Sequence, residues 1–236
     1  EDGIKWSPGT CRSIRNDFRI MSCACRNVSF DLGKCFIFTL ELNERWEGGP
    51  LLAKVKSHCL RIFDKYCKDE DHVGVAAYTV RGDQTLSLGR KAYNAPKQRA
   101  MLDVATTSTS EMVSPSLPFA MQMVVDSGET MEKDSYILLL TDGYSWDQDG
   151  YRAIKRQIEK MNRERKTLIH LIIVGLDIED EEVVDECKTM CCVSKRSFFV
   201  EATLENVDAV FASVISVVNP MDPTGPCLQG MTMEKF

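Results

Sequence analysis

The sequence predicts a doubly wound α/β fold with a mainly parallel central sheet and one antiparallel edge strand. Long apolar segments such as "KCFIFTL" and "SYILLLTDG" are expected of strands that helices cover on both faces. Amphipathic segments alternate with these strands, which is typical of a parallel sheet. After the second apolar segment, a turn and the short segment "TLSL" predict a hairpin that supplies the antiparallel strand.

The expected elements follow one another in a regular order. The strands are predicted at residues 34–40, 72–80, 85–88, 135–143, 167–177 and 197–202. Apolar residues spaced as on one helix face predict helices near 51–66, 96–106, 117–125, 151–161, 177–190 and 207–215. Residues 34–218 are therefore expected to form one domain, with 1–33 as an N-terminal extension packed on it and 219–236 as a C-terminal tail.

Length, composition and charge limit the possible functions. A chain of 236 residues that is 44% hydrophobic can bury the core of one large domain. Its net charge of -6 argues against nucleic acid and anionic lipid as partners, because both require a basic surface. The longest apolar run is far shorter than the ~20 residues of a membrane helix, so membrane insertion is not expected. The chain begins at Glu1 and has no signal-like segment, which predicts a piece of a larger intracellular, cytoplasmic protein or assembly.

The ten cysteines are interpreted mostly as buried thiols. Cys35 lies in an expected strand, and Cys59 and Cys67 lie along an expected helix. Two further groups, at positions 11, 23 and 25 and at positions 187, 191 and 192, lack paired C-x-x-C spacing and a nearby histidine. This pattern disfavours zinc, and it leaves open whether any cysteine pair is oxidised.

Polar side chains follow two of the buried strands at the point where each strand ends. Glu41, Asn43 and Arg45 alternate after the first strand, and Asp142 follows the third long strand. In open α/β sheets, sites form beyond the carboxyl ends of the strands, where the strand order reverses. We therefore expect these four residues to share one rim of the sheet.

The order of elements, the hairpin after the second strand and the segment "ILLLTDG" resemble the von Willebrand factor A (VWA) domain family over about residues 34–218. The family's metal site uses a D-x-S-x-S motif after the first strand, a threonine before a central helix and an aspartate after the fourth strand. On this resemblance, Glu41 stands in place of the first Asp, and Asn43 and Arg45 stand in place of the two serines. Asp142 retains the later Asp.

The resemblance implies a degenerate metal site rather than a working one. The threonine position falls near Ala95 or Pro96, and neither residue has a hydroxyl group. Mg²⁺ prefers near-octahedral oxygen ligands, and a guanidinium group repels it. No cofactor is therefore expected, and Mg²⁺ is disfavoured. We predict that Arg45 takes the place of the ion and bonds Glu41 or Asp142; the alternative is that Arg45 points into solvent and the site is empty.

The same rim carries residue types that dominate binding energy at protein interfaces. Arg45, Trp46, Tyr144 and Trp146 lie in two neighbouring loops, which predicts a protein partner at this rim. The alternative is that one or two of the aromatic rings cover the domain's own core. No set of base, nucleophile and oxyanion donor is evident, so the domain is not expected to be an enzyme. The sequence thus predicts a metal-independent interaction module, as one domain of a larger scaffold, with a Mg²⁺-dependent adhesion or receptor domain as the alternative.

Overall fold

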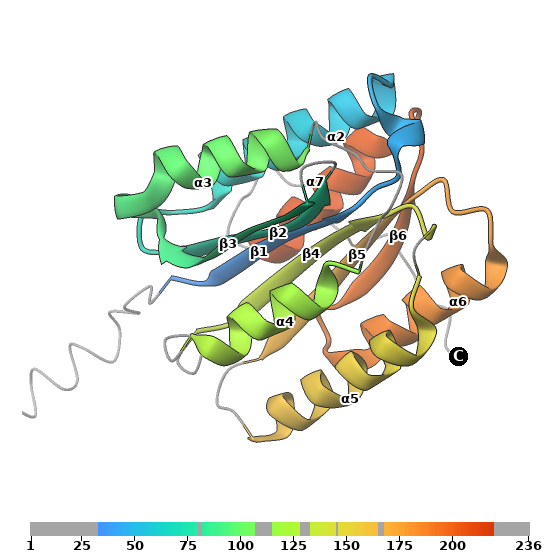
Figure 1. Cartoon of the computed structure of the whole chain (residues 1–236). Helices are drawn as coiled ribbons and strands as arrows, with labels where there is room; N and C mark the ends of the chain where they lie inside the picture. Colours follow the sequence, from blue (N-terminus) through green and yellow to red (C-terminus); the bar gives the residue numbers. More distant parts are fainter. Residues whose placement is uncertain are drawn as a thin grey trace, which may run out of the picture. The chain divides into compact units, whose positions relative to one another are not determined.

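The computed structural model describes residues 33–79, 82–106, 115–127, 133–144, 146–164 and 168–219, shown in Figure 1. Six strands form one sheet in the order β3-β2-β1-β4-β5-β6. Their bounds are β1 Cys35–Glu41, β2 His72–Thr79, β3 Gly82–Arg90, β4 Ser135–Thr141, β5 Ile169–Leu176 and β6 Phe198–Ala202. All neighbouring strands pair in parallel except β2 and β3, which are antiparallel. The predicted fold class is confirmed.

The central strands are buried along their whole length, as their apolar composition predicts. Every residue of β1, β4 and β5 is buried. Side chains alternate between the two faces of a strand, so Phe36 and Phe38 enter one hydrophobic core while Ile37 enters the other. Two separate cores therefore lie on opposite faces of the sheet.

Helices cover both faces of this sheet (Figure 1). One face packs against α2 (Pro50–Arg61), α3 (Lys91–Ala105) and α7 (Val207–Val218). The other face packs against α4 (Leu117–Asp126), α5 (Gln148–Glu164) and α6 (Glu181–Met190). Short helical turns complete the chain: η1 Glu44–Trp46, the π-helix η2 Ile62–Tyr66 and η4 Cys191–Val193.

Two elements differ from the sequence-based expectation. The edge strand β3 runs from Gly82 to Arg90 and is longer than the short strand expected there. Helix α3 starts at Lys91, well before residue 96. The early start has a tertiary cause, because Lys91 Nζ donates to the carbonyl oxygens of Phe63 and Cys67 at 2.6 Å each. These bonds anchor the first turn of α3 to the end of η2, a contact that local periodicity does not reveal.

Several predictions from the sequence concern residues near the ends of the chain. Residues 1–32 and 220–236 lie outside the described residues, so the packed extension and the tail remain predictions.

Among the described helices, none is long and apolar enough to span a membrane. Among the six described cysteines no disulfide forms; Cys192 is exposed and the other five are buried. This supports the interpretation of Cys35, Cys59 and Cys67 as buried thiols.

Candidate functional site

The strand order of the sheet reverses between β1 and β4, and the predicted rim residues lie at this point. Glu41 is the last residue of β1 and pairs in register with Thr141 of β4. Asp142 follows directly, and its backbone N–H lies 3.4 Å from the Glu41 carbonyl oxygen. Both carboxylates therefore start from neighbouring positions at the carboxyl end of the sheet, where ligands of this fold class bind.

The Glu41 carboxylate points into the protein. Its Oε1 accepts hydrogen bonds from the backbone N–H groups of Ser116 at 2.6 Å and Leu117 at 2.9 Å, at the start of α4. Its Oε2 accepts a short hydrogen bond from the Tyr151 hydroxyl of α5. Burial raises the pKa of Glu41 to about 7, although these three donors act in the opposite direction by favouring the ionised form. Glu41 is thus a core carboxylate with three fixed donors.

A second hydroxyl-bearing residue beside Glu41 is Ser116. The sequence predicts the threonine position of the family's metal site near Ala95 or Pro96, before a central helix. That prediction is wrong, because both residues lie within α3. Ser116 directly precedes α4, and its Oγ donates to the Leu40 carbonyl oxygen at 3.0 Å while its N–H binds Glu41. The Ser116 hydroxyl therefore bonds the backbone of β1, whereas the Ser116 backbone N–H bonds Glu41.

Asp142 holds the two rim loops together. Its Oδ2 accepts from the Asn43 N–H at 3.0 Å and from the indole N–H of Trp46 at 2.9 Å. Its Oδ1 accepts from the Tyr144 N–H at 3.1 Å. The Arg45 Nε lies 3.6 Å from Oδ2, within ion-pair distance. One buried carboxylate therefore fixes η1 and the loop after β4 by two backbone bonds, one side-chain bond and one ion pair.

The Arg45 side chain runs from Asp142 toward solvent. Its Nη1 lies 3.3 Å from Oε1 of Glu179, which follows β5, and its guanidinium carbon lies 5.2 Å from the centroid of the Trp46 ring. The side chain is 38% exposed. Within the part of the chain that the structure describes, no hydrogen bond or ion pair joins Arg45 to Glu41. Arg45 and Asn43 therefore lie with Asp142, and Glu41 is separate from them. The head of Arg45 is thus partly in solvent and paired with two acids.

The rim aromatics divide between the two faces of the sheet. Trp46 packs against the core beneath α2 and α7, whereas Trp146 packs against the core beneath α5 and α6. The Trp146 ring meets the Tyr151 ring edge-on at a centroid distance of 4.3 Å, and its indole N–H donates to Glu186 Oε2 at 2.7 Å. Tyr144 is 67% exposed. Both tryptophans therefore contribute to the domain's own core, and Tyr144 is the freely exposed ring of the set.

A small cavity lies beside Trp146, between α5 and α6. Its volume is about 100 Å³, and it is lined by residues that include Trp146, Tyr151, Arg152, Glu186 and Met190. A larger cavity of about 300 Å³ lies between β3 and α4, next to Leu88, Phe119 and Met123. Neither lining includes Glu41 or Asp142, but the smaller cavity includes the rim residue Trp146.

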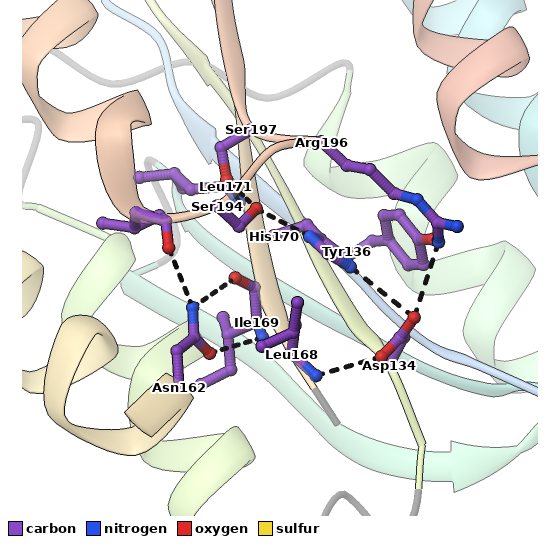
Figure 2. Close-up of polar contacts among 11 residues, drawn as sticks. Asp134, Tyr136, Asn162, Leu168, Ile169, His170, Leu171, Ser194, Arg196 and Ser197 are labelled. Carbon is purple, nitrogen blue, oxygen red and sulfur yellow. Dashed lines mark hydrogen bonds and ion pairs between the residues drawn. The ribbon is translucent and has the colours of Figure 1, made fainter. Parts of the chain in front are cut away.

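A second polar cluster lies at the opposite end of the sheet (Figure 2). His170, near the start of β5, contacts Ser194 Oγ with its Nδ1 at 2.7 Å and approaches Asp134 Oδ2 with its Nε2 at 3.6 Å. The Ser194 hydroxyl also bonds Ser197 Oγ at 2.7 Å. An Asp, a His and a Ser in line invite comparison with hydrolytic triads. However, the imidazole is 2% exposed and packs on the Tyr136 ring, so a substrate has no direct access to it.

This second cluster instead fastens the amino-terminal ends of β4 and β5 to the turn before β6. Asp134 Oδ1 accepts from the Leu168 N–H at 3.0 Å, and Arg196 donates to the Tyr136 hydroxyl at 2.7 Å (Figure 2). The contact with His170 lowers the pKa of Asp134, and the Leu168 N–H and the Arg196 charge act in the same direction. No local motif in the sequence marks this cluster, since its members are far apart in the chain.

Solved structures match the chain over most of its length. BatB, a conserved hypothetical protein from Bacteroides thetaiotaomicron, is 15% identical, with a TM-score of 0.52 over 78% of this chain and 98% of BatB. Proximal thread matrix protein 1 of the mussel byssus is 16% identical, with a TM-score of 0.53 over 79% of this chain and 46% of the mussel protein. The latter was also solved with zinc in its MIDAS motif, the metal-ion-dependent adhesion site of VWA domains. The described domain has the VWA fold.

The similarity of this VWA-like domain to these structures concerns the fold alone, because the identities are low. The chain spans about half the length of the mussel protein, with 46% of that protein covered. The SpRpn10 VWA domain also matches, at 12% identity and a TM-score of 0.48 over 76% of this chain and 94% of that domain. No protein-family model and no curated protein sequence matches the chain.

Proposed function

We propose that this VWA-like domain is a non-catalytic interaction module that docks a protein partner at its rim without a divalent ion. The proposed contact residues are Arg45, Trp46, Tyr144 and Trp146. The observation that carries the proposal is the engagement of both rim carboxylates. Glu41 is satisfied by three donors from α4 and α5, and Asp142 is satisfied by three donors from the rim loops.

The donor set of the rim does not suit a hard divalent cation. Mg²⁺ requires near-octahedral oxygen ligands at about 2.0–2.1 Å. Asp142 Oδ2 already accepts two N–H groups and lies 3.6 Å from the Arg45 cation. Glu41 has a pKa raised to about 7, so a proton competes for it near neutral pH. Binding of an ion would require breaking these bonds and moving Arg45, which disfavours the Mg²⁺-dependent alternative.

The same bonds prepare the rim for a protein partner. Asp142 fixes the backbone of both loops, so little conformational freedom remains to be lost when a partner binds. Tyr144 offers an exposed ring, and Arg45 lies beside the half-buried Trp46. Tyrosine, tryptophan and arginine are the residue types that most often dominate binding energy. The expected setting is one domain of a larger protein or assembly.

A non-catalytic role follows from the chemistry of the rim. Within the described residues, the two rim carboxylates are buried and fully bonded, which leaves no free base beside an accessible nucleophile. The Asp134, His170 and Ser194 cluster lies at the other end of the sheet, and its imidazole is inaccessible. We therefore assign partner binding, not catalysis, to this domain.

Two measurements test the proposal. Co-purification of the full chain from native cells identifies partners, and Tyr144→Ala is expected to lose the rim partner. Tyr93→Ala is the matched control, because Tyr93 is also exposed, at 78%, but lies on α3 away from the rim. Isothermal titration with MgCl₂ and MnCl₂ is expected to give no binding heat. Equal loss of partner in both tyrosine variants, or a saturable heat that Asp142→Ala removes, contradicts the proposal.

A further inference from the structure

The outward face of α5 carries a continuous row of cations. The helix buries Tyr151, Ile154 and Ile158 against the core. Arg152, Arg156, Lys160 and Arg163 are exposed, and their spacing of three or four residues places them on one stripe opposite the buried face. From the first to the last, the stripe runs about 16 Å along the helix at ~1.5 Å per residue.

Most of this stripe lacks neutralising partners. Arg152 pairs with Glu186 of α6 at 2.8 Å, and the nearby Lys155 pairs with Glu159. Arg156, Lys160 and Arg163 make no ion pair with any residue that the structure describes. Like charges at this spacing repel one another along a helix. In a chain of net charge -6, a row of cations without ion pairs to the described residues fits an anionic partner.

The cavity beside Trp146 lies at the head of this stripe. It combines the apolar surfaces of Trp146, Tyr151 and Met190 with Arg152 and Lys155. Glu186 also lines it, but its carboxylate accepts from Trp146, Gln148 and Arg152 and is therefore compensated. A cavity of about 150 Å³ holds a benzene-sized ligand. The volume of about 100 Å³ found here suits a single aliphatic side chain.

We propose that α5 binds an acidic, extended protein segment. One apolar side chain of the segment enters the Trp146 cavity, and the acidic residues that follow it pair with Arg156, Lys160 and Arg163. The proposal rests on the proposed function, because Trp146 belongs to the rim, and it deepens that function by naming the chemistry of the partner. An acidic segment satisfies the row of cations and the apolar cavity at the same time.

The surroundings of the stripe favour a narrow polyanion over a broad one. Helix α6 packs beside α5 and exposes Glu181, Glu182 and Asp185 (Figure 1). A membrane surface or a nucleic-acid duplex that reached the stripe would also meet these acids and be repelled. The apolar face of α5 is buried in the core, so the helix has no face left for insertion into lipid. A single extended segment can follow the stripe and avoid α6.

Fluorescence anisotropy with the full chain tests this proposal. The probe is a short labelled peptide with one leucine followed by several glutamates, measured at low and at high salt. We expect saturable binding that salt weakens. Arg156→Glu is expected to weaken it about fivefold, because reversal replaces an exposed attraction by a repulsion. Arg61→Glu, an exposed arginine of α2 on the other face of the sheet, is the matched control and is expected to have no effect.

Further probes separate the proposal from its competitors. A peptide with serine in place of leucine is expected to bind more weakly, and a lysine peptide is expected not to bind. Equal effects of Arg156→Glu and Arg61→Glu overturn the proposal, as does tighter binding to phosphatidylserine vesicles or to duplex DNA than to the acidic peptide. Loss of the rim partner in Tyr144→Ala, with no peptide binding in the unaltered chain, refutes this inference but not the proposed function.

Discussion

Ionisation of Glu41 is expected to control the stability of this domain between acid and neutral pH. Burial raises the pKa of Glu41 from 4.5 to about 7. At a pH between these two pKa values, Glu41 keeps its proton in the folded chain and loses it in the unfolded chain. The free energy of unfolding therefore falls as pH rises through this window. The contribution of Glu41 is complete below about pH 4.5 and is lost above about pH 7.

The size of this effect follows from the change in pKa. Each pH unit between the unfolded and folded values corresponds to ~1.4 kcal/mol. The change from 4.5 to about 7 therefore corresponds to about 3 kcal/mol of unfolding free energy. Glu41 is fully buried, so solvent screening does not reduce this figure. A change of this size is a substantial fraction of the total stability of a typical domain.

Glu41→Gln removes the titration while keeping the shape of the side chain. Its amide oxygen can still accept from the Ser116 and Leu117 N–H groups, and the Tyr151 hydroxyl can rotate to accept from the amide N–H₂. Urea denaturation, followed by tryptophan fluorescence from about pH 4.5 to about pH 8, measures the difference between the two chains. The variant is expected to gain about 3 kcal/mol relative to the original chain across this range.

Parallel stability profiles for the two chains refute this reasoning, because all other titrating groups are common to both. Tyr151→Phe provides an independent check. The Tyr151 hydroxyl favours the ionised form of Glu41, so its removal raises the pKa of Glu41 further. The fall in stability is then expected to move to higher pH. A fall at unchanged or lower pH contradicts the assignment of this titration to Glu41.

Three further predictions concern other parts of the domain. Asp142→Ala leaves several rim donors unsatisfied and is expected to cost about 1–3 kcal/mol of unfolding free energy, measured by urea denaturation against Asp126→Ala as an exposed control. Asp134 has a lowered pKa, so its contribution to stability is present above its usual pKa and disappears as pH falls through the lowered value; Asp134→Asn is expected to reduce this acid-side loss in pH-dependent denaturation. Iodoacetamide with peptide mass spectrometry is expected to modify the exposed Cys192 in the native chain and to spare the buried thiols whose pKa is raised by burial: Cys59, Cys67, Cys187 and Cys191. Modification of these four thiols to the same extent as Cys192 contradicts that prediction.

The tertiary structure changes the interpretation of the rim more than that of the fold. The sequence placed Glu41, Asn43, Arg45 and Asp142 at one edge of the sheet, and the structure brings Asn43 and Arg45 together with Asp142. The direction of Glu41 depends on Ser116 and Tyr151, which lie 75 and 110 residues away in the chain. Tyr151 has the spacing of a core residue, so nothing in its local pattern marks its hydroxyl as a partner of Glu41.

The sequence by itself determined the layers of this protein. Continuous apolar runs require strands that are covered on both faces, and the alternation with amphipathic helices requires parallel connections. Only the tertiary structure decided how the buried polar groups are satisfied and on which face each tryptophan packs. Burial is recorded in local periodicity, residue by residue. The hydrogen-bond donors of a buried carboxylate, in contrast, come from the helices that lie beside it. Which helices lie there depends on how they cross the sheet.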